Sequence, residues 1–172
     1  NMEKTLIIAI AQSGTTKDTN TFIEMAKNRG ASVIALLNKR NGDISYIADH
    51  TLYLGNGRDI EIAVPSTKTY LCHLVLGYIF TLNLISKISN DFKTLSTKLK
   101  EILKVSEIIL VILKKNKVTN TNTLYKKFES NQNWYCLYDD VSKKYASMEI
   151  RIKLSECCYK TLPYMNVNDF VK

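Results

Sequence analysis

The residues of this chain that are best suited to chemistry follow its first apolar run. Gln12-Ser13-Gly14-Thr15-Thr16 stands between the aliphatic residues 6–10 and a stretch with helical spacing. Backbone N–H groups at a helix start and nearby hydroxyls both donate hydrogen bonds to phosphate, and Gly14 lets the main chain approach the anion. The segment therefore predicts a phosphate-binding loop that needs no metal. A capped helix start without a ligand is the alternative interpretation.

A second polar cluster, Val64-Pro65-Ser66-Thr67-Lys68, also precedes a stretch with helical spacing. If both clusters follow parallel strands, they lie at the carboxyl edge of one sheet, where open α/β proteins bind ligands. The sequence therefore predicts one concave site shared by Ser13, Thr16 and Ser66. An ordinary helix cap beside a solvated lysine is the alternative here.

The elements around these clusters alternate between strand and helix in the first half of the chain. Three short apolar runs are typical of parallel strands covered on both faces. They are residues 6–10, 32–37 and 51–54. Residues 19–29 have helical spacing and end at Gly30, which suits a helix C-terminus. The apolar residues 71–85 are too few to cross a bilayer and predict a buried helix, so an α/β fold with a parallel sheet is expected.

The second half is expected to be mostly helical. The pattern predicts helices over 91–113 and 145–159, a strand over 134–138 and a Lys/Asn/Thr-rich break over 114–123. Glu149, Lys153 and Glu156 share one face of the last helix at spacing i, i+4, i+7. By residue type alone, this stripe is a solvated row of salt bridges.

Three segments resemble the sugar isomerase domain family, and most closely the isomerase part of the glutamine:fructose-6-phosphate aminotransferases. Residues 6–19 (LIIAIAQSGTTKDT) are similar to that family's strand, Ser-Gln-Ser-Gly-x-Thr loop and following Asp-Thr, with Ala11 in place of the first serine. Residues 57–70 (GRDIEIAVPSTKTY) are similar to its Glu-Ile-x-Val-x-Ser-Thr-Lys segment. More weakly, residues 145–156 (YASMEIRIKLSE) resemble the helix that carries the family's catalytic glutamate.

The resemblance implies a fold, a ligand and a set of site residues. The fold is an α/β three-layer sandwich with a parallel sheet, of flavodoxin-like type and in an incomplete form. The ligand is a hexose 6-phosphate such as fructose 6-phosphate, which is isomerised between aldose and ketose or aminated without a cofactor. The phosphate would be held by Gln12, Ser13, Thr16 and Ser66, with Gly14, Thr15, Val64 and Lys68 as further candidates. Glu156 would be the general base that moves a proton between C1 and C2, beside Lys153.

Two departures from the family pattern change the expected activity. The family's Gly-Arg-Gly loop before the catalytic helix is replaced here by Tyr138-Asp139-Asp140-Val141, and its His-Gly-Pro tripeptide, whose histidine opens the sugar ring, has no counterpart. We therefore expect a piece of a longer enzyme or a degenerate relative, weak or inactive by itself. Its parts would be most of a first lobe (1–90), a helical connection (91–133) and the start of a second lobe (134–172). A non-catalytic phosphosugar sensor or scaffold is the alternative function.

The composition narrows the classes of function that the chain could have. The chain is 45 % hydrophobic and carries 24 basic and 16 acidic residues, which gives a net charge of +8. It also contains four cysteines and two histidines. Because 20 of the 24 cations are Lys, nucleic-acid recognition is disfavoured. Base stacking on Tyr125 and Phe128 beside the lysines of 114–127 is the minority alternative. The cysteine spacing predicts reduced thiols and no metal site, and the N-terminal residues lack a signal-peptide pattern. We expect a cytoplasmic protein, without a membrane span, that dimerises through an uncovered sheet edge or apolar face.

Overall fold

The computed structural model describes residues 1–55, 57, 61, 65–115 and 126–171. By its contacts the chain divides into two compact units, one comprising Asn1–Ile62 with Ser66–Lys104 and the other Ala63–Pro65 with Val105–Lys172. Among the described residues, each unit has a parallel sheet of its own, with three strands in the first unit and two in the second.

The first unit is built on alternating strands and helices, as the sequence predicts. Its elements are β1 (Leu6–Ala11), α1 (Lys17–Asn28), β2 (Ser32–Leu37), α2 (Ile44–Ile47), β3 (His50–Tyr53) and α3 (Thr67–Ser89). The strands lie side by side in the order β1-β2-β3. Their aliphatic and β-branched residues suit a parallel sheet that helices cover. Beyond the end of α1, Gly30 adopts a φ of +96°, which confirms its predicted place after a helix.

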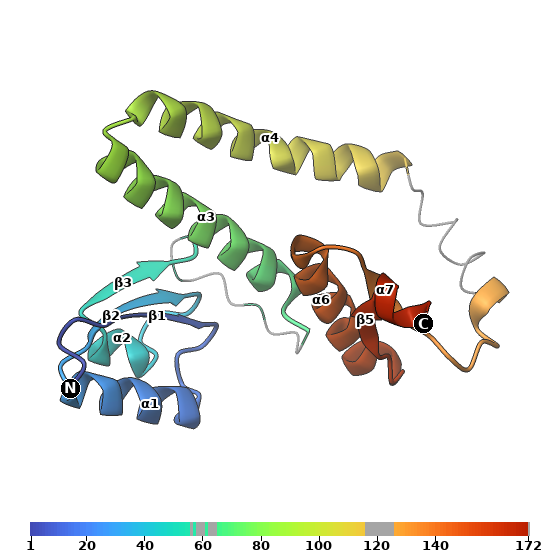
Figure 1. Ribbon diagram of the computed structural model, residues 1–172, viewed down its shortest axis with the longest axis horizontal. Helices are drawn as coiled ribbons and strands as arrows, with labels where there is room; N and C mark the ends of the chain where they lie inside the picture. The colour runs from blue at the N-terminus through green and yellow to red at the C-terminus, as the bar shows by residue number, and fades with distance from the viewer. Residues whose placement is uncertain (56, 58–60, 62–64, 116–125, 172) are drawn as a thin grey trace. The chain divides into compact units, whose positions relative to one another are not determined.

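The helices of the first unit form layers on the sheet. α1 and α2 lie on one face, and α3 approaches the other (Figure 1). The core of the first face consists of Ala9, Ile23, Val33, Ala35, Leu37 and Ile44. On the opposite side of β2, Leu36 is buried, and its carbonyl oxygen lies 3.3 Å from Nε2 of His73 on α3. This is the α/β layering with a parallel sheet that was expected.

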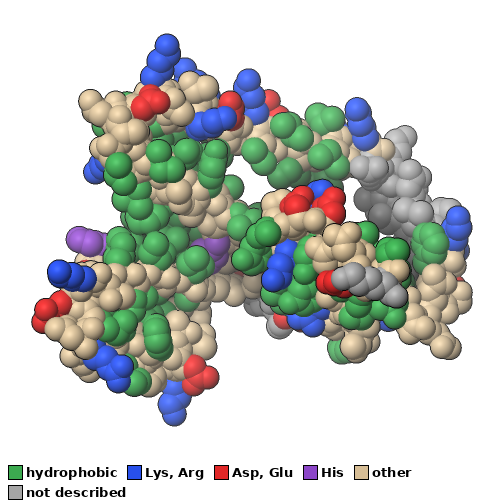
Figure 2. Space-filling model, in the orientation of Figure 1, with side chains coloured by type: hydrophobic (Ala, Val, Ile, Leu, Met, Phe, Trp, Pro, Cys, Tyr) green, Lys and Arg blue, Asp and Glu red, His purple; other side chains and the backbone are tan. Residues whose placement is uncertain are grey.

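The apolar side of α3 is exposed, so the prediction of a buried helix is wrong for this chain. Only Thr69 and Ser86 are buried in α3, while Leu74 and Tyr78 are each about half exposed. Hydrophobic side chains are visible along this helix in Figure 2. α3 has 23 residues and contains an 18-residue window with a mean hydropathy of 1.6, so among the described helices it alone is long and apolar enough to cross a membrane. The sequence pattern indicates that the apolar side of this helix would be buried against another element. In the described structure, the sheet packs against α3 near the start of the helix.

The second unit contains short elements that the sequence analysis did not predict. α4 (Phe92–Lys115) leads into it, followed by β4 (Cys136–Tyr138), α6 (Val141–Cys158), β5 (Tyr164–Asn166) and α7 (Val167–Phe170). The two long helices were expected. β5, α7 and also α2 in the first unit have three or four residues each, which is too few for a hydrophobic period to be recognised.

Gly42 and Gly77 provide a matched pair that tests the packing of the loops. A Cβ at Gly42 would collide with the carbonyl oxygen of Ser13, whereas nothing lies within 4 Å of a Cβ at Gly77. Gly42→Ala is therefore expected to lower the free energy of unfolding by about 1–3 kcal/mol. Gly77→Ala, inside α3, is expected to raise it by about 0.5–1 kcal/mol. Urea unfolding followed by circular dichroism measures both, and equal effects of the two substitutions would contradict this packing.

Candidate functional site

The side chain of Gln12 joins the two clusters that the sequence singled out. Its Nε2 donates to the carbonyl oxygen of Glu61 at 2.9 Å, and its Oε1 accepts from Oγ of Ser66 at 2.8 Å. The carbonyl oxygen of Gln12 accepts from the N–H groups of Asn38 and Lys39 at 3.2 and 3.0 Å. The ends of β1 and β2 and the start of α3 therefore meet at one edge, the carboxyl edge of the sheet.

The loop between β1 and α1 presents hydroxyl groups at this edge. Oγ of Ser13 and Oγ1 of Thr15 are 2.8 Å apart, and Oγ of Ser13 also accepts from the N–H of Thr15 at 3.3 Å. Thr16 is the N-cap residue of α1, but its side chain makes no capping hydrogen bond and is exposed. Gly14 has a φ of +69° and its carbonyl oxygen accepts from the N–H of Ile44, which holds the loop in place.

The start of α3 already has an anion, the carboxylate of Glu61. Its two oxygens accept from the backbone N–H groups of Lys68 and Thr69 at 3.1 and 2.7 Å. Hydrogen bonding from the Thr69 side chain, with these N–H groups, lowers the pKa of Glu61 from its ordinary value of 4.5. Ser66 lies at this helix start with a φ of +47°, Lys68 has an exposed side chain, and Val64 lies outside the described residues.

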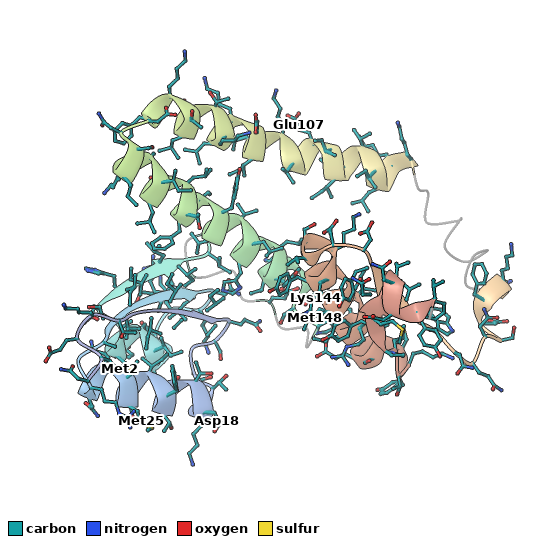
Figure 3. All side chains as sticks on the ribbon, in the orientation of Figure 1. Met2, Asp18, Met25, Glu107, Lys144 and Met148 are labelled. Carbon is teal, nitrogen blue, oxygen red and sulfur yellow. The ribbon has the colours of Figure 1, made fainter. Side chains whose placement is uncertain are left out.

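Two further long helices also begin at a carboxylate of the chain. Asp91 accepts from the N–H of Thr94 at the start of α4, and Asp140 accepts from the N–H of Lys143 at the start of α6, each at 3.0 Å. Among the described helices of more than ten residues, α1 alone has no hydrogen bond from a first-turn N–H group to a carboxylate of the described chain. Asp18 stands in its first turn, exposed, where the helix dipole favours a negative charge (Figure 3). The hydroxyl-lined start of α1 is thus the one that is open to an anion from outside.

The predicted catalytic residues lie together on α6, in the second unit. Nζ of Lys153 is 3.1 Å from Oε1 of Glu149 and 3.5 Å from Oε2 of Glu156. Burial opposes the charge of the Lys153 ammonium, but the two carboxylates outweigh it and raise its pKa. The Glu156 side chain is 35 % exposed, so the group is partly desolvated and still reachable.

Asp139 and Asp140 directly precede this helix. Asp140 caps α6, and hydrogen bonds from the Ser142 side chain and the Lys143 backbone hold its pKa far below the usual range. Nζ of Lys143 lies 2.7 Å from Oδ1 of Asp139 and 3.2 Å from Oδ2 of Asp140. An external anion would meet two carboxylates at this helix start. Nowhere in the described ranges do three His, Cys, Asp or Glu residues come together as metal ligands would.

Two residues of the first site were not singled out from the sequence. Glu61 reaches backbone groups seven and eight residues further on, so the three-residue spacing of a capping box does not reveal it. Asn38 is buried after β2, and its Nδ2 donates to Oγ1 of Thr69 at 3.3 Å. The position of Asn38, an amide residue directly after an apolar strand, is the sequence feature that could have indicated its place in the site.

These features define an α/β domain with a hydroxyl-lined loop at the carboxyl edge of a parallel sheet, a place where such folds bind ligands. Residues 2–83 match the family model of the SIS domain, and this part of the chain belongs to that sugar isomerase family. The expected family and the expected α/β fold are both confirmed.

The relatives include isomerising glutamine–fructose-6-phosphate aminotransferases. That of Thermococcus kodakarensis is 32 % identical over 158 residues, which is 91 % of this chain and 25 % of the relative, and that of Clostridium tetani is 39 % identical over 126 residues, 73 % of this chain and 20 % of the relative. Among solved structures, the C-terminal domain of the Francisella tularensis glucosamine-fructose-6-phosphate aminotransferase has a TM-score of 0.83 at 22 % identity and covers 96 % of this chain. The chain spans 46 % of that structure, so it covers less than half of it.

The capping carboxylate of Glu61 predicts a pH dependence of stability. Because the pKa of Glu61 is lowered by folding, its stabilising effect is complete above its unfolded-state pKa and is lost as the pH falls through the lower folded-state pKa. Glu61→Gln is therefore expected to lower the melting temperature at pH near 7, with a difference from the unmodified chain that shrinks in acid. Glu24→Gln, an exposed position on α1, is the control and is expected to show neither effect. A Glu61→Gln difference that stays constant into acid would contradict the charge-based explanation.

Proposed function

We propose that the first unit binds the phosphate group of a hexose 6-phosphate at the start of α1. The observation that carries the proposal is the open N-cap of α1 beside the hydroxyls of Ser13, Thr15 and Thr16, while the starts of α3, α4 and α6 are occupied by carboxylates of the chain. Backbone N–H groups, a helix dipole and neutral hydroxyl donors together suit a phosphate. The relatives named as fructose-6-phosphate aminotransferases support a hexose 6-phosphate as the ligand class.

Gln12 and Ser66 have a second role in this proposal. The hydrogen bond between their side chains holds the start of α3 beside the phosphate loop, which would bring sugar hydroxyls within reach of both. Ser66 keeps a φ of +47°, a left-handed conformation that costs a serine free energy and that the Gln12 contact helps to maintain. Glu61 keeps phosphate away from α3 because its carboxylate would repel a second anion there.

Removal of two hydroxyls tests the binding site. At a hundredfold excess over its Kd, fructose 6-phosphate is expected to raise the melting temperature of the chain by roughly 5–10 °C, since a ligand bound only by the native state then stabilises it by about 2.7 kcal/mol. The double variant Ser13→Ala/Thr16→Ala is expected to lose this shift. Thr81→Ala/Ser89→Ala, which removes two exposed hydroxyls within α3, is the control and is expected to keep it. An unchanged shift in the first double variant would place the phosphate elsewhere.

In the second unit, Glu156 is proposed as the general base of an aldose–ketose isomerisation, with Lys153 beside it. A carboxylate can move a proton between neighbouring sugar carbons, and a protonated lysine can offset the negative charge of an enediolate. The raised pKa of Lys153 keeps it protonated at neutral pH. Asp139 and Asp140 would repel a phosphorylated substrate near this helix, so the chain alone is proposed to be weakly active or inactive.

A coupled assay for glucose 6-phosphate formation from fructose 6-phosphate tests the catalytic proposal. The chain is expected to show no more turnover than its Glu156→Gln variant, because a poorly positioned acid–base group forfeits roughly 10²- to 10⁴-fold in rate. Glu101→Gln, which removes the exposed partner of Lys98, is the control. Robust turnover that Glu156→Gln abolishes would overturn the inactive proposal and support the base. Robust turnover that survives Glu156→Gln would overturn the base.

A non-catalytic phosphosugar sensor or scaffold is the second candidate, favoured by the two carboxylates before α6. Ligand-dependent melting without turnover of any hexose 6-phosphate would support it.

We further propose that copies of the chain associate, because α3 leaves Leu71, Leu74 and Tyr78 about half exposed. Light scattering of the full chain measures its mass in solution and tests this association.

A further inference from the structure

An aromatic pocket in the second unit lies outside the site described above. It is a shallow, largely open pocket of about 250 Å³, lined by Phe128, Asn131, Asn133, Trp134 and Tyr135. This volume is just below the range of pockets that enclose drug-sized ligands, and it suits a single ring system. The lining comes from the short segment 128–135, in which three of eight residues are aromatic.

Local contacts hold two of these rings in place. Nε1 of Trp134 donates to the carbonyl oxygen of Asn131 at 2.9 Å. The ring of Tyr135 packs edge-on against Phe170 of α7, with centroids 5.3 Å apart. Phe128 and Tyr135 nevertheless remain 40 % and 48 % exposed. A flat ligand can stack on the exposed parts of the Phe128 and Tyr135 rings, of which that of Tyr135 is held in position by Phe170.

Positive charge surrounds the pocket. Nζ of Lys127 lies 5.5 Å from the ring centroid of Phe128, and Nζ of Lys160 lies 5.9 Å from that of Trp134. Within residues 126–135 the single acidic side chain is Glu129, against Lys126 and Lys127. A ligand that carries an anionic group beside a flat ring complements this arrangement, and the amides of Asn131 and Asn133 can pair with the polar edge of a base.

We propose that this pocket binds a nucleoside monophosphate, with the base stacked among Phe128, Trp134 and Tyr135 and the phosphate near Lys127 or Lys160. A sugar phosphate would supply the charge without a flat aromatic face. The proposal is independent of the phosphosugar site, because it uses none of the residues at the carboxyl edge of the first sheet.

Trp134 is the single tryptophan of the chain and reports on the pocket directly. Titration of the full chain with AMP is expected to quench its fluorescence to saturation, with excitation at the red edge where adenine does not absorb. Added salt is expected to weaken the binding, and ribose 5-phosphate, which has no base, is expected to leave the fluorescence unchanged. Phe128→Ala and Lys160→Gln are each expected to weaken AMP binding roughly three- to tenfold.

Matched controls separate this pocket from the first site and from general charge effects. Lys144→Gln on α6 removes one positive charge from the same unit, outside the pocket lining, and is expected to leave AMP binding unchanged (Figure 3). Ser13→Ala/Thr16→Ala is also expected to bind AMP normally, whether or not it binds fructose 6-phosphate. Circular dichroism checks the folding of Phe128→Ala, and Lys160→Gln, which changes a side chain at the surface, gives a second reading if that variant misfolds.

Three outcomes would overturn the proposal. A quench that rises linearly without saturation would show collision rather than binding. An equal response to ribose 5-phosphate would show that the charge alone is recognised. Binding of a single-stranded oligonucleotide without binding of AMP would identify the lysine-flanked segment as a nucleic-acid surface instead.

Discussion

The amide of Gln12 is the contact on which the candidate site of the first unit depends. The side-chain amide donates to the backbone carbonyl oxygen of Glu61 and accepts from Ser66, while the backbone carbonyl oxygen of Gln12 accepts from two N–H groups after β2. Three segments that are far apart in the sequence are therefore held at one edge of the sheet. A carboxylate or an ammonium group in this place could not satisfy both partners, because the first only accepts and the second only donates hydrogen bonds.

The choice between helix starts follows from the same demand for hydrogen-bond partners. The first turn of every helix leaves backbone N–H groups without partners inside the helix, and the positive end of the helix dipole favours a negative charge there. Glu61, Asp91 and Asp140 meet this demand on α3, α4 and α6. A helix start whose N–H groups donate to a carboxylate of the same chain is stabilised, but it can no longer bind an anion from outside. The start of α1, lined by hydroxyls that carry no charge, combines less local stabilisation with more capacity to bind a ligand.

The parts of this arrangement that are encoded locally could be predicted from the sequence. β1 and β2 of the first unit are continuous aliphatic runs, and the loop after β1 follows directly from such a run, so the strands and the loop were found. Glu61 was missed because its partners are seven and eight residues away and their meeting depends on the fold of the intervening chain. The exposure of α3 was missed because periodicity identifies an apolar side without showing whether another element covers it. The site of Lys153 and Glu156 was predicted only through the family resemblance, since Glu–Lys spacing on a helix is common at solvated surfaces.

The acidic start of α6 satisfies an N–H group of its own helix from within the chain. A glycine-rich loop satisfies a helix start poorly by itself and leaves its N–H groups available for a ligand. Asp140 supplies the missing acceptor from within the chain, and Lys143 balances its charge and that of Asp139. The helix that carries Lys153 and Glu156 is therefore stabilised without any bound anion. Because Asp140 caps α6 without a ligand, the position of the proposed base Glu156 on this helix is no measure of activity, and it is compatible with a chain that binds a ligand without turning it over.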